Sequence, residues 1–119
     1  MKRCGLLGER LGHSYSPVIH AQLGDYAYRL YECPREKLGD FLKTGDFDGL
    51  NVTIPYKKAV IPYCAELSPM AAAIGSVNTL LRRPDGTLYG DNTDAFGFES
   101  LLRDAGLDPK GKKCLVLGS

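Results

Sequence analysis

Two polar side chains and a lysine in one short run suggest a binding site for a polar small molecule. The run is Asn51-Val52-Thr53-Ile54-Pro55-Tyr56-Lys57, and we expect a strand that passes into a helix beginning at Pro55. Strand side chains alternate, so Asn51 and Thr53 share one face. Lys57 falls in the first helical turn, where the positive end of the helix dipole opposes its charge. The plain alternative is that Lys57 belongs to a solvated pair of surface lysines.

A second helix start contains two serine hydroxyls. Ser16 is a good N-cap, Pro17 is a good first residue, and Gly24 is a typical end signal. The hydroxyls of Ser14 and Ser16 lie beside the free backbone N–H groups of the first turn, a combination suited to a carboxylate or a phosphate. The alternative is that Ser16 only caps the helix and Ser14 faces water, since capping serines are common.

Two further polar residues have both a structural and a functional interpretation. The run Gly90-Asp91-Asn92-Thr93-Asp94 is a third helix start, in which Asp91 or Asn92 can cap. Asp94 lies in the first turn, where a carboxylate is stabilised even without a catalytic role. Asn78 interrupts an apolar strand, and a buried asparagine must hydrogen-bond either to backbone or to a ligand.

Strand and helix patterns alternate along the chain and would position these runs. We predict strands at residues 3–7, 27–32, 49–54, 76–82, 87–89 and 112–117, and helices at 17–24, 35–44, 56–67 and 93–105. Pro62 is a candidate break in the helix at 56–67. The turn Pro84-Asp85-Gly86 joins two of the strands into a hairpin. The expected fold class is therefore α/β, with a mostly parallel mixed sheet, helices on both faces and an antiparallel hairpin.

The composition is that of an ordinary soluble domain. The 119 residues are 44% hydrophobic and 24% charged, with a formal net charge of +1. This balance offers no basic patch for nucleic acid or an anionic membrane, and no apolar stretch approaches the roughly 20 residues of a membrane span. The four cysteines are widely spaced without a C-x-x-C motif. We therefore expect no metal site, and reduced thiols in a cytoplasmic protein.

Taken together, the polar runs resemble the signatures of the shikimate dehydrogenases. His13-Ser14-Tyr15-Ser16-Pro17 resembles H-S-x-S-P, and the run 51–57 resembles N-V-T-x-P-x-K. Gly75-Ser76-Val77-Asn78-Thr79 resembles G-A-V-N-T, with Ser76 in place of the usual alanine, and the run 90–94 resembles G-x-N-T-D. A second departure is Ala21, where the family often has asparagine. The four motifs follow the family's order along the whole chain, so their combination is far more specific than any one of them.

The resemblance implies a reaction and assigns residues to it. The reaction is the NADP-dependent, reversible reduction of 3-dehydroshikimate to shikimate, part of aromatic amino acid biosynthesis. Lys57 would transfer the proton, and Asp94 would orient Lys57 and the substrate. These two are the expected catalytic residues. Ser14 and Ser16 would hold the substrate carboxylate. The full set of expected substrate contacts is Ser14, Ser16, Asn51, Thr53, Lys57, Asn78 and Asp94.

The resemblance also divides the chain. Residues 1–106 correspond to the shikimate-binding domain, and residues 107–119 to a linker and the first strand of a Rossmann-type NADP-binding domain. The apolar strand 114–117 leads into Gly118 and Ser119, which would begin an incomplete glycine-rich loop for the cofactor. We therefore expect a truncated chain that does not turn over alone. An unpaired apolar strand would also favour self-association.

Two other functions stay open on these residues. The quinate/shikimate dehydrogenases share the same motifs. A non-catalytic module that captures a hydroxy acid would need similar contacts without the chemistry.

Overall fold

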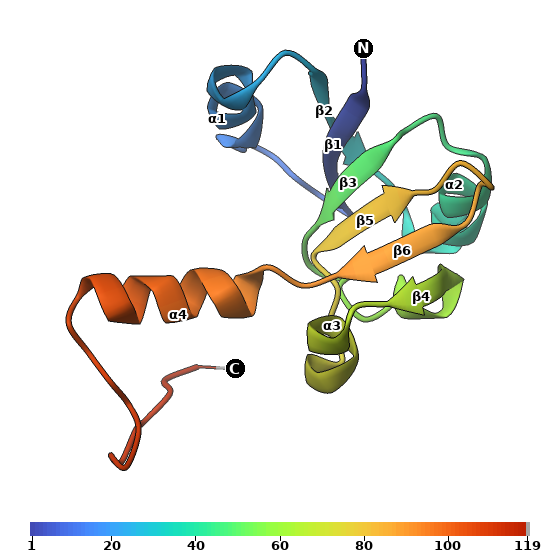
Figure 1. Cartoon of the computed structure of the whole chain (residues 1–119). Coiled ribbons are helices and arrows are strands. Elements are labelled where there is room, and N and C mark those ends of the chain that lie inside the picture. The colour runs from blue at the N-terminus through green and yellow to red at the C-terminus, as the bar shows by residue number, and fades with distance from the viewer. Residues whose placement is uncertain (119) are drawn as a thin grey trace.

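Six strands form one mixed sheet, with helices on both of its faces (Figure 1). The computed structural model describes residues 1–118. The strands are β1 (Arg3–Gly8), β2 (Ala27–Glu32), β3 (Gly49–Val52), β4 (Cys64–Leu67), β5 (Thr79–Arg82) and β6 (Leu88–Asp91). The α-helices are α1 (Ser16–Leu23), α2 (Leu38–Thr44), α3 (Pro69–Ile74) and α4 (Asp94–Asp104). Two 3-10 helices, η1 (Arg35–Lys37) and η2 (Ile61–Tyr63), precede α2 and β4.

The strand order is β2-β1-β3-β5-β6-β4, and this confirms the predicted fold class. β1 pairs in parallel with β2 and β3, and β4 pairs in parallel with β6. The predicted hairpin is β5–β6, and β5 also runs antiparallel to β3. Its turn contains Gly86 at φ +87°, a left-handed conformation that favours glycine.

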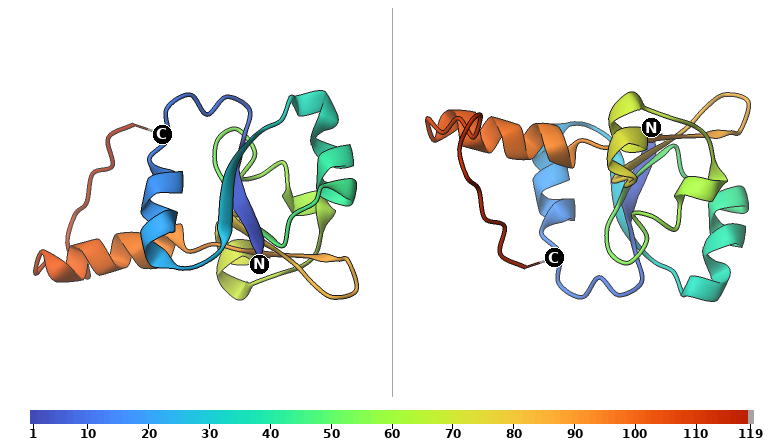
Figure 2. Two further views of the ribbon diagram at one scale, coloured as in Figure 1. Left: turned by 90° about the horizontal axis from the view of Figure 1, so that it is seen from above. Right: turned by 90° about the horizontal axis from the view of Figure 1, so that it is seen from below.

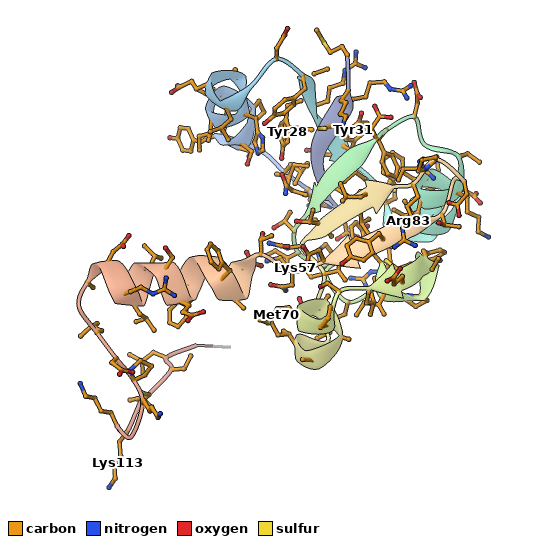
Figure 3. All side chains as sticks on the ribbon, in the orientation of Figure 1. Tyr28, Tyr31, Lys57, Met70, Arg83 and Lys113 are labelled. Carbon is orange, nitrogen blue, oxygen red and sulfur yellow. The ribbon has the colours of Figure 1, made fainter. Side chains whose placement is uncertain are left out.

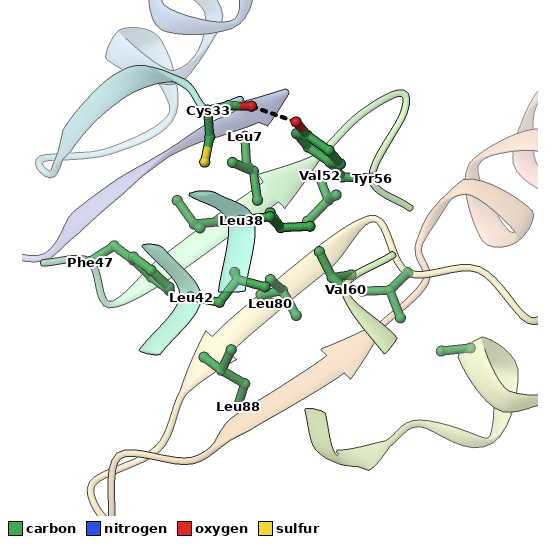
Figure 4. Packing of buried hydrophobic residues seen from close by; sticks show 13 residues of the cluster. Leu7, Cys33, Leu38, Leu42, Phe47, Val52, Tyr56, Val60, Leu80 and Leu88 are labelled. Carbon is green, nitrogen blue, oxygen red and sulfur yellow. Dashed lines mark hydrogen bonds between the residues drawn. The ribbon is translucent and has the colours of Figure 1, made fainter. Parts of the chain in front are cut away.

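The main hydrophobic core lies on one face of the sheet. Apolar strand residues that alternate toward this face pack against α2 and the segments that flank it (Figure 4). The largest fully buried side chains are those of Tyr56, Phe47, Leu7, Leu42, Leu80, Val60 and Val77. α1 lies on the opposite side of the sheet from α2 (Figure 2). The sheet therefore separates a closed core from a second face, on which Tyr28 of β2 meets α1.

Close approach of two strands depends on a glycine in β1. A Cβ atom at Gly5 would lie 2.3 Å from the carbonyl oxygen of Arg29 and 2.3 Å from the ring of Tyr31. No larger side chain fits there without moving β2, because the nearest atom belongs to backbone. The aromatic ring of Tyr31 fills the space instead and packs on Phe41 of α2.

The predicted helix at 56–67 is wrong. Residues 53–60 form turns, followed by η2 and β4. The carbonyl of Lys57 accepts a hydrogen bond from the Val77 N–H at 2.7 Å, so it is not available to a helical partner four residues on. Pro62 has no N–H to donate. Lys57 therefore does not lie in a helical first turn, and the argument from the helix dipole fails.

The predicted strand at 112–117 is also wrong. Within the described residues, this segment pairs with no other strand, and Leu115, Val116 and Leu117 are 83%, 84% and 86% exposed. A strand requires a hydrogen-bonding neighbour, and residues 1–118 offer it none. α3 was not predicted at all. Smaller differences are that β3 ends at Val52, β5 begins at Thr79 and β6 extends to Asp91.

No helix in the described part of the chain is both long enough and apolar enough to cross a membrane.

Candidate active site

One edge of the sheet gathers most of the predicted site residues. The carboxyl ends of the parallel strands β1 and β3 lie beside the amino end of β5 and the carboxyl end of β6. Asn51 is paired with Thr79 across β3 and β5, and Thr79 is paired with Asp91 across β5 and β6. Residues far apart in the sequence therefore lie on adjacent strands. Loops leave the sheet at this edge, and such loops often carry binding residues.

Lys57 and Asp94 form the closest contact among the predicted residues. The Lys57 Nζ donates to Asp94 Oδ2 at 2.7 Å, across 37 positions of sequence. Lys57 lies near the point where β6 passes into α4 (Figure 3). The two side chains are 36% and 55% exposed. An ion pair this exposed adds about 0–1 kcal/mol to stability, so stability alone does not account for the arrangement. A ligand can reach both groups.

The backbone around Lys57 is held firmly although its side chain is exposed. The adjacent Tyr56 is fully buried, and its hydroxyl donates to the carbonyl of Cys33 (Figure 4). The bond from the Val77 N–H to the Lys57 carbonyl ties the same turn to the segment before β5. The side chain of Lys57 therefore extends from a fixed anchor.

Asn78 connects this turn to the start of α4. The side chain is 8% exposed, and its Oδ1 accepts from the Thr93 N–H at 2.9 Å. Its Nδ2 donates to Thr93 Oγ1 at 2.9 Å, and Thr79 Oγ1 donates to its Oδ1 at 3.0 Å. Asn78 thus places the residue that precedes Asp94.

Asn92 is a second buried asparagine beside Asn78, and it caps α4. Its Oδ1 accepts from the Asp94 N–H at 2.9 Å and the Ala95 N–H at 3.3 Å, while its Nδ2 donates to the Ser76 carbonyl at 3.0 Å. Of the two capping residues considered from the sequence, Asn92 is the one that caps. It attaches the first turn of α4 to the segment before β5.

Ser14 and Ser16 lie at the start of α1, although their roles differ from the prediction. α1 begins at Ser16 itself, so the N-cap position falls on Tyr15. Ser14 Oγ accepts from the Ser16 N–H at 3.2 Å and satisfies one of the free donors of the first turn. Ser16 was predicted to be the N-cap, and this is wrong because its side chain caps nothing. Among the described residues, no hydrogen bond joins these serines to Lys57 or Asp94.

Asn51 in β3 and Thr53 just beyond the strand make different contacts. Asn51 Oδ1 accepts from the hydroxyl of Tyr28 at 2.8 Å. Thr53 lies just beyond the end of β3, and its N–H donates to the Leu7 carbonyl at 2.9 Å. A Cβ atom at Gly8 would lie 3.0 Å from the Thr53 methyl group, so the glycine leaves room for this residue.

Three residues of this edge were not predicted to act in the site. Tyr28 contacts Asn51, Asn92 caps α4, and Thr93 meets Asn78. Asn92 and Thr93 lie inside a recognised run, and Tyr28 lies in a strand that was predicted correctly. The strand pattern does not reveal the partner of Tyr28.

The predicted cofactor contacts are Gly118 and Ser119. Gly118 has φ +84°, as a glycine in a phosphate-binding turn can have, and its role in cofactor binding stays a prediction. Ser119, the other predicted cofactor contact, lies outside the described residues. No group of three or more potential metal-ligating side chains occurs in the described part of the chain.

Comparison with curated proteins finds enzymes of one kind. The chain is 43% identical to the shikimate dehydrogenase (NADP(+)) of Halothermothrix orenii, over 97% of this chain and 43% of that protein. It is likewise 43% identical to the enzyme of the same name from Syntrophomonas wolfei, over 97% of this chain and 42% of that protein. The chain thus spans less than half the length of these relatives.

Solved structures and a family model agree with these relatives. Shikimate dehydrogenase 1 from Peptoclostridium difficile matches with a TM-score of 0.92 and 39% identity, over 100% of this chain and 47% of that one. The Thermus thermophilus enzyme, solved in complex with NADP(H) and shikimate, matches with a TM-score of 0.82 and 39% identity, over 92% and 44%. The family model described as the shikimate dehydrogenase substrate binding domain matches residues 6–80. This chain belongs to the family of shikimate dehydrogenase substrate-binding domains.

Proposed function

We propose that the chain is the substrate-binding half of an NADP-dependent shikimate dehydrogenase, in which Lys57 and Asp94 act on the substrate. The observation that carries the proposal is the 2.7 Å contact between Lys57 Nζ and Asp94 Oδ2 at an accessible edge of the sheet. Family membership supports the identity of the substrate, because relatives with this domain are named for shikimate. A cytoplasmic location and the absence of nucleic acid or membrane partners stay predictions.

The groups at this edge match the chemistry of shikimate, which has one carboxylate and three hydroxyls. Ser14 and Ser16 bind the carboxylate with hydroxyls and backbone N–H groups at the start of α1. Thr53, Asn78 and Asp94 bind substrate hydroxyls, with Asn51 in support. Asn51 is held by the β3–β5 pairing, and Asp94 is held by the Asn92 cap. Such positioning lowers the entropic cost of binding.

Lys57 serves as the proton-transfer group. In the direction of reduction, a bound NADPH would supply the hydride that adds to the carbonyl carbon of 3-dehydroshikimate. The carbonyl oxygen gains negative charge as this happens, and the ammonium of Lys57 donates a proton to it. Asp94 accepts a hydrogen bond from Lys57 and directs the ammonium toward the substrate. A positioned group of this kind contributes roughly 10²–10⁴-fold to the rate.

Binding to the chain itself tests the substrate assignment. Titration of ¹⁵N-labelled protein with shikimate should move the amide signals of Ser14, Ser16, Thr53, Asn78 and Asp94 together. We expect a dissociation constant in the millimolar range, about 4 kcal/mol, because the accessible edge leaves the ligand partly hydrated. Shifts confined to residues 110–113 would place the site elsewhere. Quinate is the matched ligand, and tighter binding of quinate would favour the quinate/shikimate enzymes.

A second measurement separates binding from turnover. With NADPH and 3-dehydroshikimate, the chain alone should cause no loss of NADPH absorbance, because it spans less than half the length of the relatives that are named for NADP(+). Absorbance loss above a protein-free control would refute the expected inactivity.

A further inference from the structure

A tyrosine outside the proposed site residues contacts one of them on the face of the sheet that α1 covers. The hydroxyl of Tyr28 in β2 donates to Asn51 Oδ1 in β3 at 2.8 Å. These strands are not neighbours, because β1 lies between them. The long phenol side chain therefore spans the β1 strand and joins two elements of the site from the side opposite the main core.

The ring of Tyr28 is held in place by α1. His20 stacks on it with a centroid distance of 3.8 Å and an interplanar angle of 8°. His20 Nδ1 is in turn 2.6 Å from the hydroxyl of Tyr26. His20 and Ser16 are four residues apart in α1 and so lie on the same side of the helix. The helix that carries Ser16 thus also fixes the orientation of the tyrosine.

The direction of the hydrogen bonds follows from the groups around the phenol. Burial raises the pKa of Tyr28 to about 12, so the phenol keeps its proton. The oxygen of a side-chain amide can only accept a hydrogen bond, so the O–H of Tyr28 is the donor in its contact with Asn51 Oδ1.

This arrangement leaves the other end of the Asn51 amide for a ligand. Among residues 1–118, the Nδ2 group of Asn51 donates no hydrogen bond. No buried side-chain nitrogen or oxygen in this part of the chain lacks a partner, so Nδ2 must reach solvent. With its oxygen bonded to the Tyr28 hydroxyl, the Asn51 amide offers the two N–H donors of Nδ2 to a ligand that comes from solvent. Donors of this kind recognise a hydroxyl or carbonyl oxygen.

We propose that Tyr28 is a positioning residue for substrate recognition, whose hydroxyl locks the Asn51 amide so that its Nδ2 group faces a substrate oxygen. The inference rests on the proposed function for the identity of the ligand. The orientation of the amide is a property of the protein without ligand. The sequence motifs explain why Asn51 is present, and Tyr28 explains which way it points.

The test compares two tyrosines of one strand. Tyr28→Phe removes the hydroxyl and keeps the ring that stacks on His20. Tyr31→Phe is the matched control, because Tyr31 lies in the same strand and packs on the core face against Phe41. Side-chain ¹⁵N relaxation of the Asn51 NH₂ group is measured in wild type and in both variants without ligand. We expect an ordered amide in wild type and Tyr31→Phe, and a mobile one in Tyr28→Phe. An equally ordered amide in Tyr28→Phe would overturn the inference.

The second arm measures shikimate affinity by amide-shift titration. Loss of one neutral hydrogen bond predicts that Tyr28→Phe binds about three- to tenfold more weakly, with Tyr31→Phe unchanged. In an Asn51→Ala background, adding Tyr28→Phe should have no further effect, because the tyrosine acts through that side chain. Equal losses in both backgrounds would also overturn the inference. If wild type fails to bind shikimate, the proposed function fails, and the relaxation arm still decides the role of Tyr28.

Discussion

Lys57 combines an exposed side chain with a tightly held backbone, and each property has a separate cause. The ring of Tyr56 is fully buried, and the Lys57 carbonyl is bonded to Val77. The side chain extends from this anchor to Asp94, whose own position follows from the Asn92 cap. A long flexible side chain thereby gains a defined direction without the desolvation cost of burial.

Replacing Lys57 tests its role in catalysis. Activity can be measured in a chimera that joins this chain, at residues 107–111, to the part of the Halothermothrix orenii enzyme beyond the matched region. Lys57→Ala should lower kcat by about 10²-fold or more and change KM little, since proton transfer matters mainly in the transition state. Lys58→Ala is the matched control, because this neighbouring lysine is exposed. Equal kcat values for Lys57→Ala and the parent chimera would sink the assignment.

The phenol of Tyr28 predicts how stability depends on alkaline pH. Its pKa is raised by burial to about 12 in the folded chain, against about 10 in an unfolded chain. Between these values the unfolded chain has lost the proton and the folded chain keeps it, so stability falls as pH rises. Urea midpoints measured from pH 9 to pH 12 should fall less steeply for Tyr28→Phe than for wild type. Tyr15→Phe, at a tyrosine that is 81% exposed, should follow wild type.

Among the elements, α4 and α3 show two ways of starting a helix. α3 begins after Ser68, whose side chain accepts from the Ala71 N–H at 3.1 Å, and Gly75 ends it at φ +71°. α4 begins after Thr93, yet the cap comes from Asn92 one position earlier. Asn92 also bonds to the Ser76 carbonyl, so its cap is at the same time the attachment of α4 to the sheet.

Removing each cap should affect its own helix. Asn92→Ala should lower the stability of the first turn of α4 by about 1 kcal/mol. Hydrogen exchange at the Asp94 and Ala95 amides should therefore become roughly fivefold faster. Ser68→Ala is the matched variant and should speed exchange at Ala71 instead. If either variant speeds hydrogen exchange equally in both helices, the whole fold is destabilised. That result would contradict the prediction that each cap stabilises only its own helix.

The elements that the sequence predicted correctly are those with local signals. β2 has the predicted bounds, the β5–β6 hairpin has its turn residues, and α4 follows an Asn cap. The helix predicted at 56–67 failed because a long-range bond from Val77 competes for the Lys57 carbonyl, and no local pattern reveals such a partner. α3 had a readable signal, since Ser68, Pro69 and Gly75 mark its start and end.

In the candidate site, too, the sequence predicted residue identities but not the contacts that depend on long-range structure. The motifs identified Lys57 and Asp94, but their contact spans 37 residues and depends on the sheet register. The roles of Ser14 and Ser16 were exchanged, because the helix begins one residue earlier than expected. Tyr28 was missed because its partner lies two strands away.

As a whole, the molecule is more extended than its length requires. The radius of gyration is 15.7 Å, whereas a compact domain of this length has about 13.5 Å. The excess comes from α4 and residues 105–118, which project from the sheet (Figure 1). α4 has no buried residue, and Phe96, Phe98 and Leu101 are more than 60% exposed. Apolar surface on this scale favours association.

The exposed segment at 112–117 predicts concentration-dependent self-association of the chain. Its apolar side chains are exposed and its backbone pairs with no strand among the described residues. Size-exclusion chromatography with light scattering should show a mass above the monomer that falls when residues 112–119 are removed. A strictly monomeric chain whose tail is ordered by relaxation measurements would contradict this reading.

The attachment of α4 at one end has a mechanical consequence. Asn92 and Thr93 hold its first turn, and no buried side chain holds the remainder. The helix is about 16 Å long, so a tilt of about 10° around its first turn would carry its far end by roughly 3 Å. Asp94 sits at the pivot and would barely move. The fold thus allows the far end of α4 to move as a rigid body while the contact between Lys57 and Asp94 keeps its geometry.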